Sequence, residues 1–263
     1  MEKIRPPAVA GTFYPANPGD LQRAVNAYLA QAAGGSVAPK AIIAPHAGYI
    51  YSGPVAAAAY KWLATSTANK IVKRVVLLGP AHRVAFSGLA THSADAFLTP
   101  LGRVSLDKEA IVLATTLPQV SVLGVAHRQE HSLEVQLPFL QSTLREFSLV
   151  PFVVSNASPA EASEVLETLW GGPETLIVIS SDLSHFHNYH TAQRLDLATA
   201  EAIENLQPDK IGYDRACGRI GIQALLLLAQ KHGLSVQRVD LRNSGDTAGS
   251  REQVVGYGAW VFT

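Results

Sequence analysis

The chain has 263 residues, of which 48% are apolar and 16% are charged, so it can bury a large core and is not intrinsically disordered. Its 21 basic and 21 acidic residues balance, which argues against nucleic acid as a main partner. Cys217 is the one cysteine, which excludes an intrachain disulfide and a zinc finger built on several cysteines.

Helical patterns and apolar extended runs alternate along the sequence. Residues 18–31 are expected to form a helix, because Asn17 is a good N-cap and Pro18 suits the first turn. Ser158 precedes a helix over 159–170 and has Glu161 three residues later, as in a capping box. The remaining expected elements, in chain order, are strand 40–44, helix 54–63, strand 74–78, a small hairpin within 88–104, helices 106–116 and 132–144, strands 148–154 and 175–179, helices 192–205 and 219–231, and strands 235–241 and 254–262.

This alternation predicts an α/β fold in which helices cover both faces of a sheet. No repeat, low-complexity tract or long linker interrupts the chain, so residues 1–263 are expected to form a single domain. The N-terminus lacks the apolar segment of a signal peptide, and the longest apolar run is too short to span a membrane. We therefore expect a cytoplasmic protein without a membrane partner.

Three apolar strands each lead into a loop that carries a histidine. His46 follows the strand at 40–44, His82 follows the strand at 74–78, and His185 follows the strand at 175–179. Ligands of open α/β sheets bind outside the carboxyl ends of the strands. If these strands are parallel neighbours, the three histidines converge on one crevice.

Histidine is the commonest protein ligand for zinc, copper, iron and nickel, so a metal site is expected in this crevice. Cys217 is a candidate third ligand, because it precedes the helix expected at 219–231 and a helix N-terminus lowers the pKa of a thiol. The alternative is that Cys217 is a small buried apolar residue, as most free cysteines are.

Further polar residues are candidates for the same pocket. Tyr49 lies in the loop of the first histidine, and Glu130 and His131 lie in the run AHRQEHSLEVQLPF. These residues could bind or orient a ligand, or they could cap a helix with a solvated face. Asn243 and Asp246 follow a late strand in a turn sequence, and their position also places them near the crevice.

Several motifs with known chemistry are absent from the sequence. It contains no GxGxxG and no GxxxxGK[ST], so dinucleotide and P-loop nucleotide binding have no support. It contains neither a GxSxG elbow nor an HExxH zinc motif. The candidate chemistry therefore depends on residues that are far apart in the sequence.

The chain resembles the Memo family, in its archaeal and bacterial branch labelled AmmeMemoRadiSam system protein B. The matching segments run in family order over nearly the whole chain. They are RPPAVAGTFYP, IIAPHAGYIYSG, LLGPAH, EHSLEVQLPF, SSDLSHF, CGRIG and NSGD. The resemblance implies a single-domain, three-layer fold with a mixed, mostly parallel central sheet, like that of the class III extradiol dioxygenases.

The resemblance also implies a set of site residues. The metal ligands would be His46, His82 and Cys217, with iron or copper as the metal and zinc as a further candidate. His185 would be the acid/base histidine, and Asp182 would hold its tautomer. Thiolate in place of the carboxylate of the dioxygenases argues against ordinary ring cleavage. The resemblance implies AMMECR-like and radical-SAM proteins as pathway partners. The signalling role of animal members of the family is not expected for this compact chain.

Three functions follow from these residues. The first is an iron- or copper-dependent redox protein that acts on an unidentified small molecule or peptide. The second is a non-catalytic protein that binds a peptide or a metal in a relict dioxygenase crevice. The third is a metal-independent hydrolase or transferase with Cys217 as nucleophile. The first requires His46, His82 and Cys217 to converge, with His185 lining the same pocket.

Overall fold

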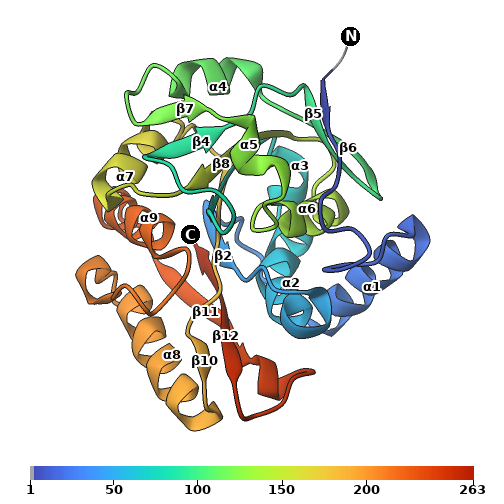
Figure 1. The fold of residues 1–263 in the computed structure, drawn as a ribbon, viewed down its shortest axis with the longest axis vertical. Helices are drawn as coiled ribbons and strands as arrows, with labels where there is room; N and C mark the ends of the chain where they lie inside the picture. The colour runs from blue at the N-terminus through green and yellow to red at the C-terminus, as the bar shows by residue number, and fades with distance from the viewer. Residues whose placement is uncertain (1–2) are drawn as a thin grey trace.

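Twelve strands make up two sheets in the computed structural model, which describes residues 3–263. The strands are β1 (Ile4–Arg5), β2 (Ala41–Ala44), β3 (Arg74–Pro80), β4 (Leu89–Thr91), β5 (Ala96–Thr99), β6 (Gly102–Ser105), β7 (Val120–Val122), β8 (Ser148–Val154), β9 (Thr175–Ser180), β10 (His185–His187), β11 (Val236–Asn243) and β12 (Val254–Phe262). Nine of them form the central sheet, in the order β10-β12-β2-β9-β3-β8-β4-β7, with β11 also paired to β12 (Figure 1).

The middle of the central sheet is parallel. Strands β2, β9, β3 and β8 are neighbours that run in one direction. Antiparallel pairs border them, because β12 pairs with β2 and β4 pairs with β8. The predicted mixed, mostly parallel sheet is therefore confirmed, and the carboxyl ends of β2, β9 and β3 lie side by side at one edge.

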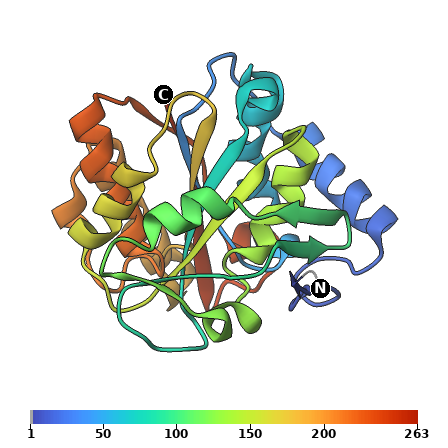
Figure 2. The same cartoon turned by 90° about the horizontal axis from the view of Figure 1, so that it is seen from above.

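Helices cover both faces of this sheet, which confirms the three-layer α/β fold. The longer helices are α1 (Pro18–Gln31), α2 (Tyr49–Thr65), α7 (Pro159–Thr168), α8 (Tyr189–Glu204) and α9 (Arg219–His232). Helix α2 packs on β12 and β2 with α1 outside it, whereas α9 packs on β9 and β3 beside α7. Figure 2 shows these two groups of helices on opposite sides of the strands.

The shorter elements complete the chain and include one departure from the prediction. They are the helices α3 (Ala68–Ile71), α4 (Lys108–Ala114), α5 (Gly124–Arg128) and α6 (Leu137–Thr143) and the 3₁₀ turns Glu134–Gln136, Pro208–Lys210 and Ser244–Asp246. The hairpin expected within 88–104 forms from β5 and β6, which join β1 in a separate sheet. Strand β4 instead extends the central sheet next to β8.

Local sequence signals explain most of the boundaries. Asn17 accepts a hydrogen bond from the N–H of Asp20 and caps α1, and Ser158 forms the predicted capping box with Glu161. The single helix predicted over 132–144 is divided into a 3₁₀ turn and α6, because Pro138 suits the first turn of a new helix rather than the interior of a long one.

Strands β2 and β9 are buried at every residue, and β3 is buried except at its first. A central strand with both faces covered reads as a continuous apolar run, which is the pattern these three segments have. Such strands provide a rigid base for the loops that follow them. Within the described residues, no helix is both long and apolar enough to cross a membrane.

Candidate metal centre

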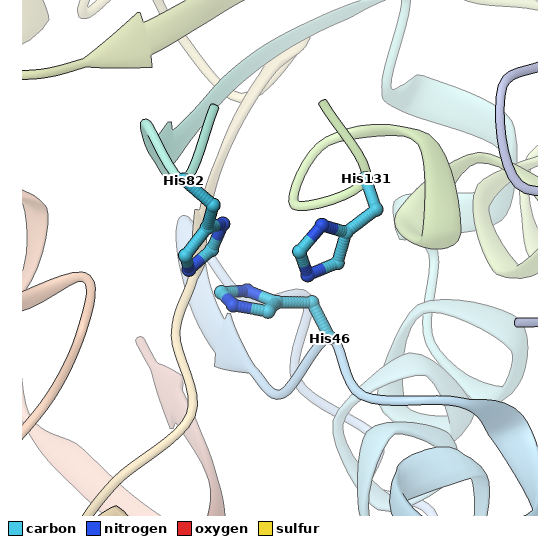
Figure 3. Close-up of side chains that lie close together, drawn as sticks. All are labelled: His46, His82 and His131. Atoms are coloured by element: carbon cyan, nitrogen blue, oxygen red, sulfur yellow. The ribbon is translucent and has the colours of Figure 1, made fainter. Parts of the chain in front are cut away.

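Three histidines from separate segments meet at the carboxyl edge of the sheet. His46 follows β2, His82 follows β3, and His131 lies in the loop between α5 and the Glu134–Gln136 turn. One potential ligand atom from each lies within 4.8 Å of those from the other two, and the side chains converge in Figure 3. This spacing allows the three imidazoles to share one metal ion after small adjustments, since metal–nitrogen bonds are about 2.0–2.1 Å long.

Hydrogen bonds determine the tautomer of His46. Its Nδ1 lies 2.8 Å from Oγ of Ser180, the last residue of β9. The hydroxyl of Ser180 donates its single proton to the carbonyl of Ser132 at 2.5 Å, so it must accept a hydrogen bond from His46. Nδ1 therefore carries the proton, and the lone pair of a neutral His46 is on Nε2.

Burial favours the neutral form of His46. Its side chain is 1% exposed. Desolvation places the pKa of His46 well below the usual value, and the nearby His82, His131 and His185 lower it further. A neutral imidazole is the form that binds metal.

Glu130 orients His82. Its carboxylate accepts hydrogen bonds from the backbone N–H of His82 at 2.6 Å and from Nδ1 of His82 at 2.9 Å. It also accepts the backbone N–H groups of His131 and Ser132. Burial would raise the pKa of Glu130, but these bonds outweigh it and lower the pKa to about 2. The ionised carboxylate therefore holds Nδ1–H of His82 and leaves Nε2 free, as in carboxylate–histidine–metal arrangements.

His131 is the third member of the cluster. Its ring stacks on His82 with 4.6 Å between centroids and contacts Phe13 at 4.5 Å. Burial lowers the pKa of His131 to about 4, although the carboxylate of Glu130 opposes the shift. Its buried Nδ1 lies 3.3 Å from Oε1 of Glu130 but forms no hydrogen bond, which is unusual for a buried polar atom. The sequence left His131 as a pocket residue that could bind or orient a ligand, and the structure places it among the potential metal ligands.

Cys217 lies next to this cluster, on the side of His46. Its Sγ is 3.4 Å from Nε2 of His46 and accepts the N–H of Asp182 at 3.3 Å. Gly218 makes this approach possible, because a Cβ at that position would lie 2.6 Å from the carbonyl oxygen of Ser180. Cys217 is not part of the group whose donor atoms all lie within 4.8 Å of one another.

The protonation state of Cys217 differs from the sequence-based expectation. The helix that follows it was expected to lower the pKa of the thiol. Desolvation and the carboxyl of Asp182 instead raise this pKa to about 12, against smaller effects of hydrogen bonds from Asp182, Ser181 and Gly218. Without a bound cation, the group is therefore a thiol at neutral pH.

Asp182 does not orient His185, contrary to the expectation from the resemblance. Its carboxylate accepts the backbone N–H of His46 at 2.8 Å, and its other oxygen lies 4.0 Å from Nε2 of His46. Burial raises the pKa of Asp182 to about 7. His185 begins β10 and pairs with Val255 of β12, so its position is determined by the sheet.

His185 nevertheless lies close enough to the cluster to interact with it electrostatically. Burial lowers its pKa, a hydrogen bond to the backbone of Leu183 opposes this shift, and the charge of His82 adds to it. His185 is therefore half-buried beside the cluster, with the backbone of Leu183 and not Asp182 as its hydrogen-bond partner.

The other predicted pocket residues have structural roles. Tyr49 is buried, and its hydroxyl donates to the carbonyl of Val135. Asn243 and Asp246 cap the 3₁₀ turn after β11, where Asp246 accepts the hydroxyl of Tyr189. The expectation that they lie near the crevice is wrong, because β12 lies between them and the loop at Ser184. Asn243 pairs with Gly256 of β12 on one side, and Gly256 forms backbone hydrogen bonds with Leu183 and Ser184 on the other side.

A buried ion pair holds the N-terminal segment against the histidine loop. Nη1 of Arg5 lies 2.6 Å from Glu134, and other nitrogens of Arg5 donate to the carbonyls of His127 and Glu130. Glu134 also accepts the hydroxyl of Tyr14. This role of Arg5 was not predicted, although Arg5 begins the RPPAVAGTFYP segment on which the family resemblance depends.

The chain is similar in sequence to the proteins of one family over nearly its whole length. A family model described as Memo-like protein matches residues 5–261. A MEMO1 family protein of Aquifex aeolicus is 36% identical over 99% of both chains, and one of Methanopyrus kandleri is 37% identical over 98% of both. Among solved structures, an uncharacterized protein of Escherichia coli K12 is 12% identical with a TM-score of 0.47, over 82% of this chain and 98% of that one.

Proposed function

The chain belongs to the Memo family, and we propose that it is a metal-dependent redox protein that holds one iron or copper ion at the histidine cluster. The observation that carries this proposal is the cluster itself, in which potential ligand atoms of His46, His82 and His131 lie within 4.8 Å of one another. Two of these rings already have Nδ1 bonded to an acceptor, which leaves Nε2 for a ligand.

The donor set fits the proposed metals. Imidazole suits iron, copper, nickel and zinc, and a neighbouring thiol favours the softer ions of this group. Cys217 is 3.4 Å from Nε2 of His46, so a small movement would bring the sulfur into the same coordination sphere. Binding would also release the proton of the thiol, since metal ligation requires the thiolate. A bound iron or copper ion would supply one-electron chemistry at this site.

His185 is the proposed proton-transfer residue. It is half-buried, its pKa is lowered by burial, and it interacts with His82 and His46. The lowered pKa keeps a fraction of the imidazole neutral, and therefore able to accept a proton, below pH 7. Oxygen consumption with catechols and thiols, measured for wild type and His185→Ala at equal metal content, tests this role. Unchanged consumption in the variant would refute it.

Metal titration tests the proposal as a whole. The protein is stripped with a chelator and titrated with Fe(II) without oxygen, with Cu(I) and with Zn(II). We expect one ion per chain, and His46→Ala should lower the affinity more than about 100-fold, since even outer hydrogen-bonding partners contribute 10–100-fold. The exposed pair of His232 with Glu167 provides a control, because His232→Ala should change nothing. No uptake of any of the three metals by the wild type would refute the proposal.

The same titration identifies the third ligand. His131→Ala should lower affinity for all three metals if His131 completes the set. Cys217→Ser should lower affinity chiefly for Cu(I) if the sulfur also binds, because serine removes a soft ligand. A loss in Cys217→Ser alone would assign the third position to the thiolate.

A metal-independent cysteine enzyme is the second candidate. The 3.4 Å distance between Sγ of Cys217 and Nε2 of His46 favours it, because a base within reach can activate a thiol. The raised pKa of the thiol opposes it. Turnover of activated acyl esters by the chelated protein, lost in Cys217→Ser, would support this candidate over the first.

A further inference from the structure

A cavity of about 390 Å³ opens beside Cys217 and holds one cationic side chain. It is lined by residues from the ends of β3 and β8 and from the start of α9, among them Ala81, Ser155 and Cys217. Arg219 is the one lysine or arginine among the lining residues. The volume is in the range of small-ligand sites, and Ala81 and Cys217 place its inner wall next to His82 and His46.

Arg219 has no acidic partner among the residues that the structure describes. Its guanidinium lies over the ring of Tyr213 at 4.7 Å, and Nη1 donates to Gln223 at 3.4 Å. Across residues 3–263, no carboxylate forms an ion pair with it. The aromatic ring restricts the guanidinium to one region of the cavity wall, so less conformational entropy is lost when an anion binds.

Two neighbouring features add positive potential and hydrogen-bonding groups. Helix α9, of 14 residues, begins at Arg219 without a side-chain cap, so its N-terminus presents partial positive charge, although the N–H of Arg219 itself donates to the carbonyl of Ala216. Ser155 and Asn156, which have a hydroxyl and an amide, also line the cavity. Thus the cavity combines a free guanidinium, a helix N-terminus and neutral polar groups.

We propose that this cavity binds a small organic carboxylate, with the carboxylate on Arg219 and the rest of the molecule directed toward Cys217 and the histidine cluster. A single guanidinium matches one carboxylate in a two-point interaction, whereas a dianionic phosphate would usually require further cations. This inference rests on the proposed function, because it identifies the class of molecule that the metal site would act on.

Benzoate, benzamide and phenyl phosphate are the probes, titrated against the full chain after chelation. Benzamide has the shape of benzoate without its charge. We expect wild type to bind benzoate about 10–100-fold more tightly than benzamide, in the range of a hydrogen bond to a charged group. Arg219→Gln should reduce this ratio to near one and Arg219→Lys should keep part of it. Arg215→Gln is the control, since Arg215 pairs with Asp214 and does not line the cavity.

Thiol labelling locates the bound anion without a substitution. Cys217 is the chain's one cysteine and lines this cavity, so N-ethylmaleimide reports on the cavity when labelling is done at alkaline pH, where a larger fraction of this thiol is ionised. Saturating benzoate should slow labelling several-fold, and benzamide at the same concentration should not. Equal binding of benzoate and benzamide, no binding of benzoate, or labelling that benzoate leaves unchanged would overturn the proposal. Tighter binding of phenyl phosphate than of benzoate would overturn the assignment to a carboxylate.

Separate measurements distinguish the two proposals. Benzoate selectivity in a protein that takes up no metal would refute the metal function and leave the carboxylate site in place. Metal uptake without benzoate selectivity would refute the carboxylate site and leave the metal function in place.

Discussion

Replacing Glu130 by glutamine should weaken metal binding without removing a ligand. The Glu130 carboxylate is 1% exposed and accepts four hydrogen bonds, two of them from His82. Glutamine has one acceptor oxygen, and its NH₂ group would face at least one backbone N–H. The variant therefore loses one or more charge-assisted bonds, each contributing about 1.5–3 kcal/mol. The ring of His82 also loses the anion that fixes its tautomer.

Two assays separate these effects. Urea unfolding of the metal-free protein should show a loss of about 2–3 kcal/mol for Glu130→Gln. Competition with a chelator should show about 10–100-fold weaker metal binding by the folded variant. Glu109→Gln is the control, because Glu109 is exposed in the first turn of α4. Wild-type metal affinity in a folded Glu130→Gln protein would show that Glu130 does not orient His82 for a metal.

Three further predictions follow from buried contacts. Arg5→Met should lower the free energy of unfolding by about 3–5 kcal/mol, because it leaves the carboxylate of Glu134 buried without its partner; urea unfolding measures this, and no recovery in Arg5→Met/Glu134→Gln would contradict the explanation. The folded state holds the pKa of His131 at about 4, below the usual 6.5, so the neutral imidazole stabilises the fold fully above pH 6.5. As the pH falls toward 4, the free energy of unfolding should decrease by about 2–3 kcal/mol from this group. Unfolding curves measured across this pH range should show a smaller decrease for His131→Asn than for wild type. Gly256→Ala should lower stability by about 1–3 kcal/mol, because the new Cβ would lie 2.0 Å from Oδ2 of Asp196; a melting temperature equal to wild type would contradict the contact.

The sequence predicted the architecture because the central strands are short apolar runs with clear ends. The strands at 148–154 and 254–262 have the predicted limits, as does the helix at 18–31. Errors occurred where tertiary contacts override local signals. Helix α2 begins at Tyr49, before the predicted start at Pro54, because the preceding loop is held by buried contacts that no local pattern records.

The candidate site was predictable in part for a geometric reason. His46 and His82 follow β2 and β3, the two parallel neighbours of β9, so their convergence at one edge of the sheet follows from topology. His131 follows no strand, and its place in the cluster depends on Glu130 and the stacking on His82. The expected partnership of Asp182 and His185 failed because the buried carboxylate of Asp182 accepts the backbone N–H of His46, whereas His185, three positions later, lies in an edge strand that is fixed by β12.

The Arg5–Glu134 pair has a consequence for how the chain folds during synthesis. The two residues are 129 positions apart, and Glu134 begins the 3₁₀ turn that directly follows the loop of His131. A ribosome adds about 5–20 residues each second, so Arg5 leaves it several seconds before its partner exists. During that interval Arg5, which is buried in the folded protein, has no carboxylate with which to pair. Contacts of such long range slow folding, and the histidine cluster is therefore expected to assemble after translation has passed its last contributing loop.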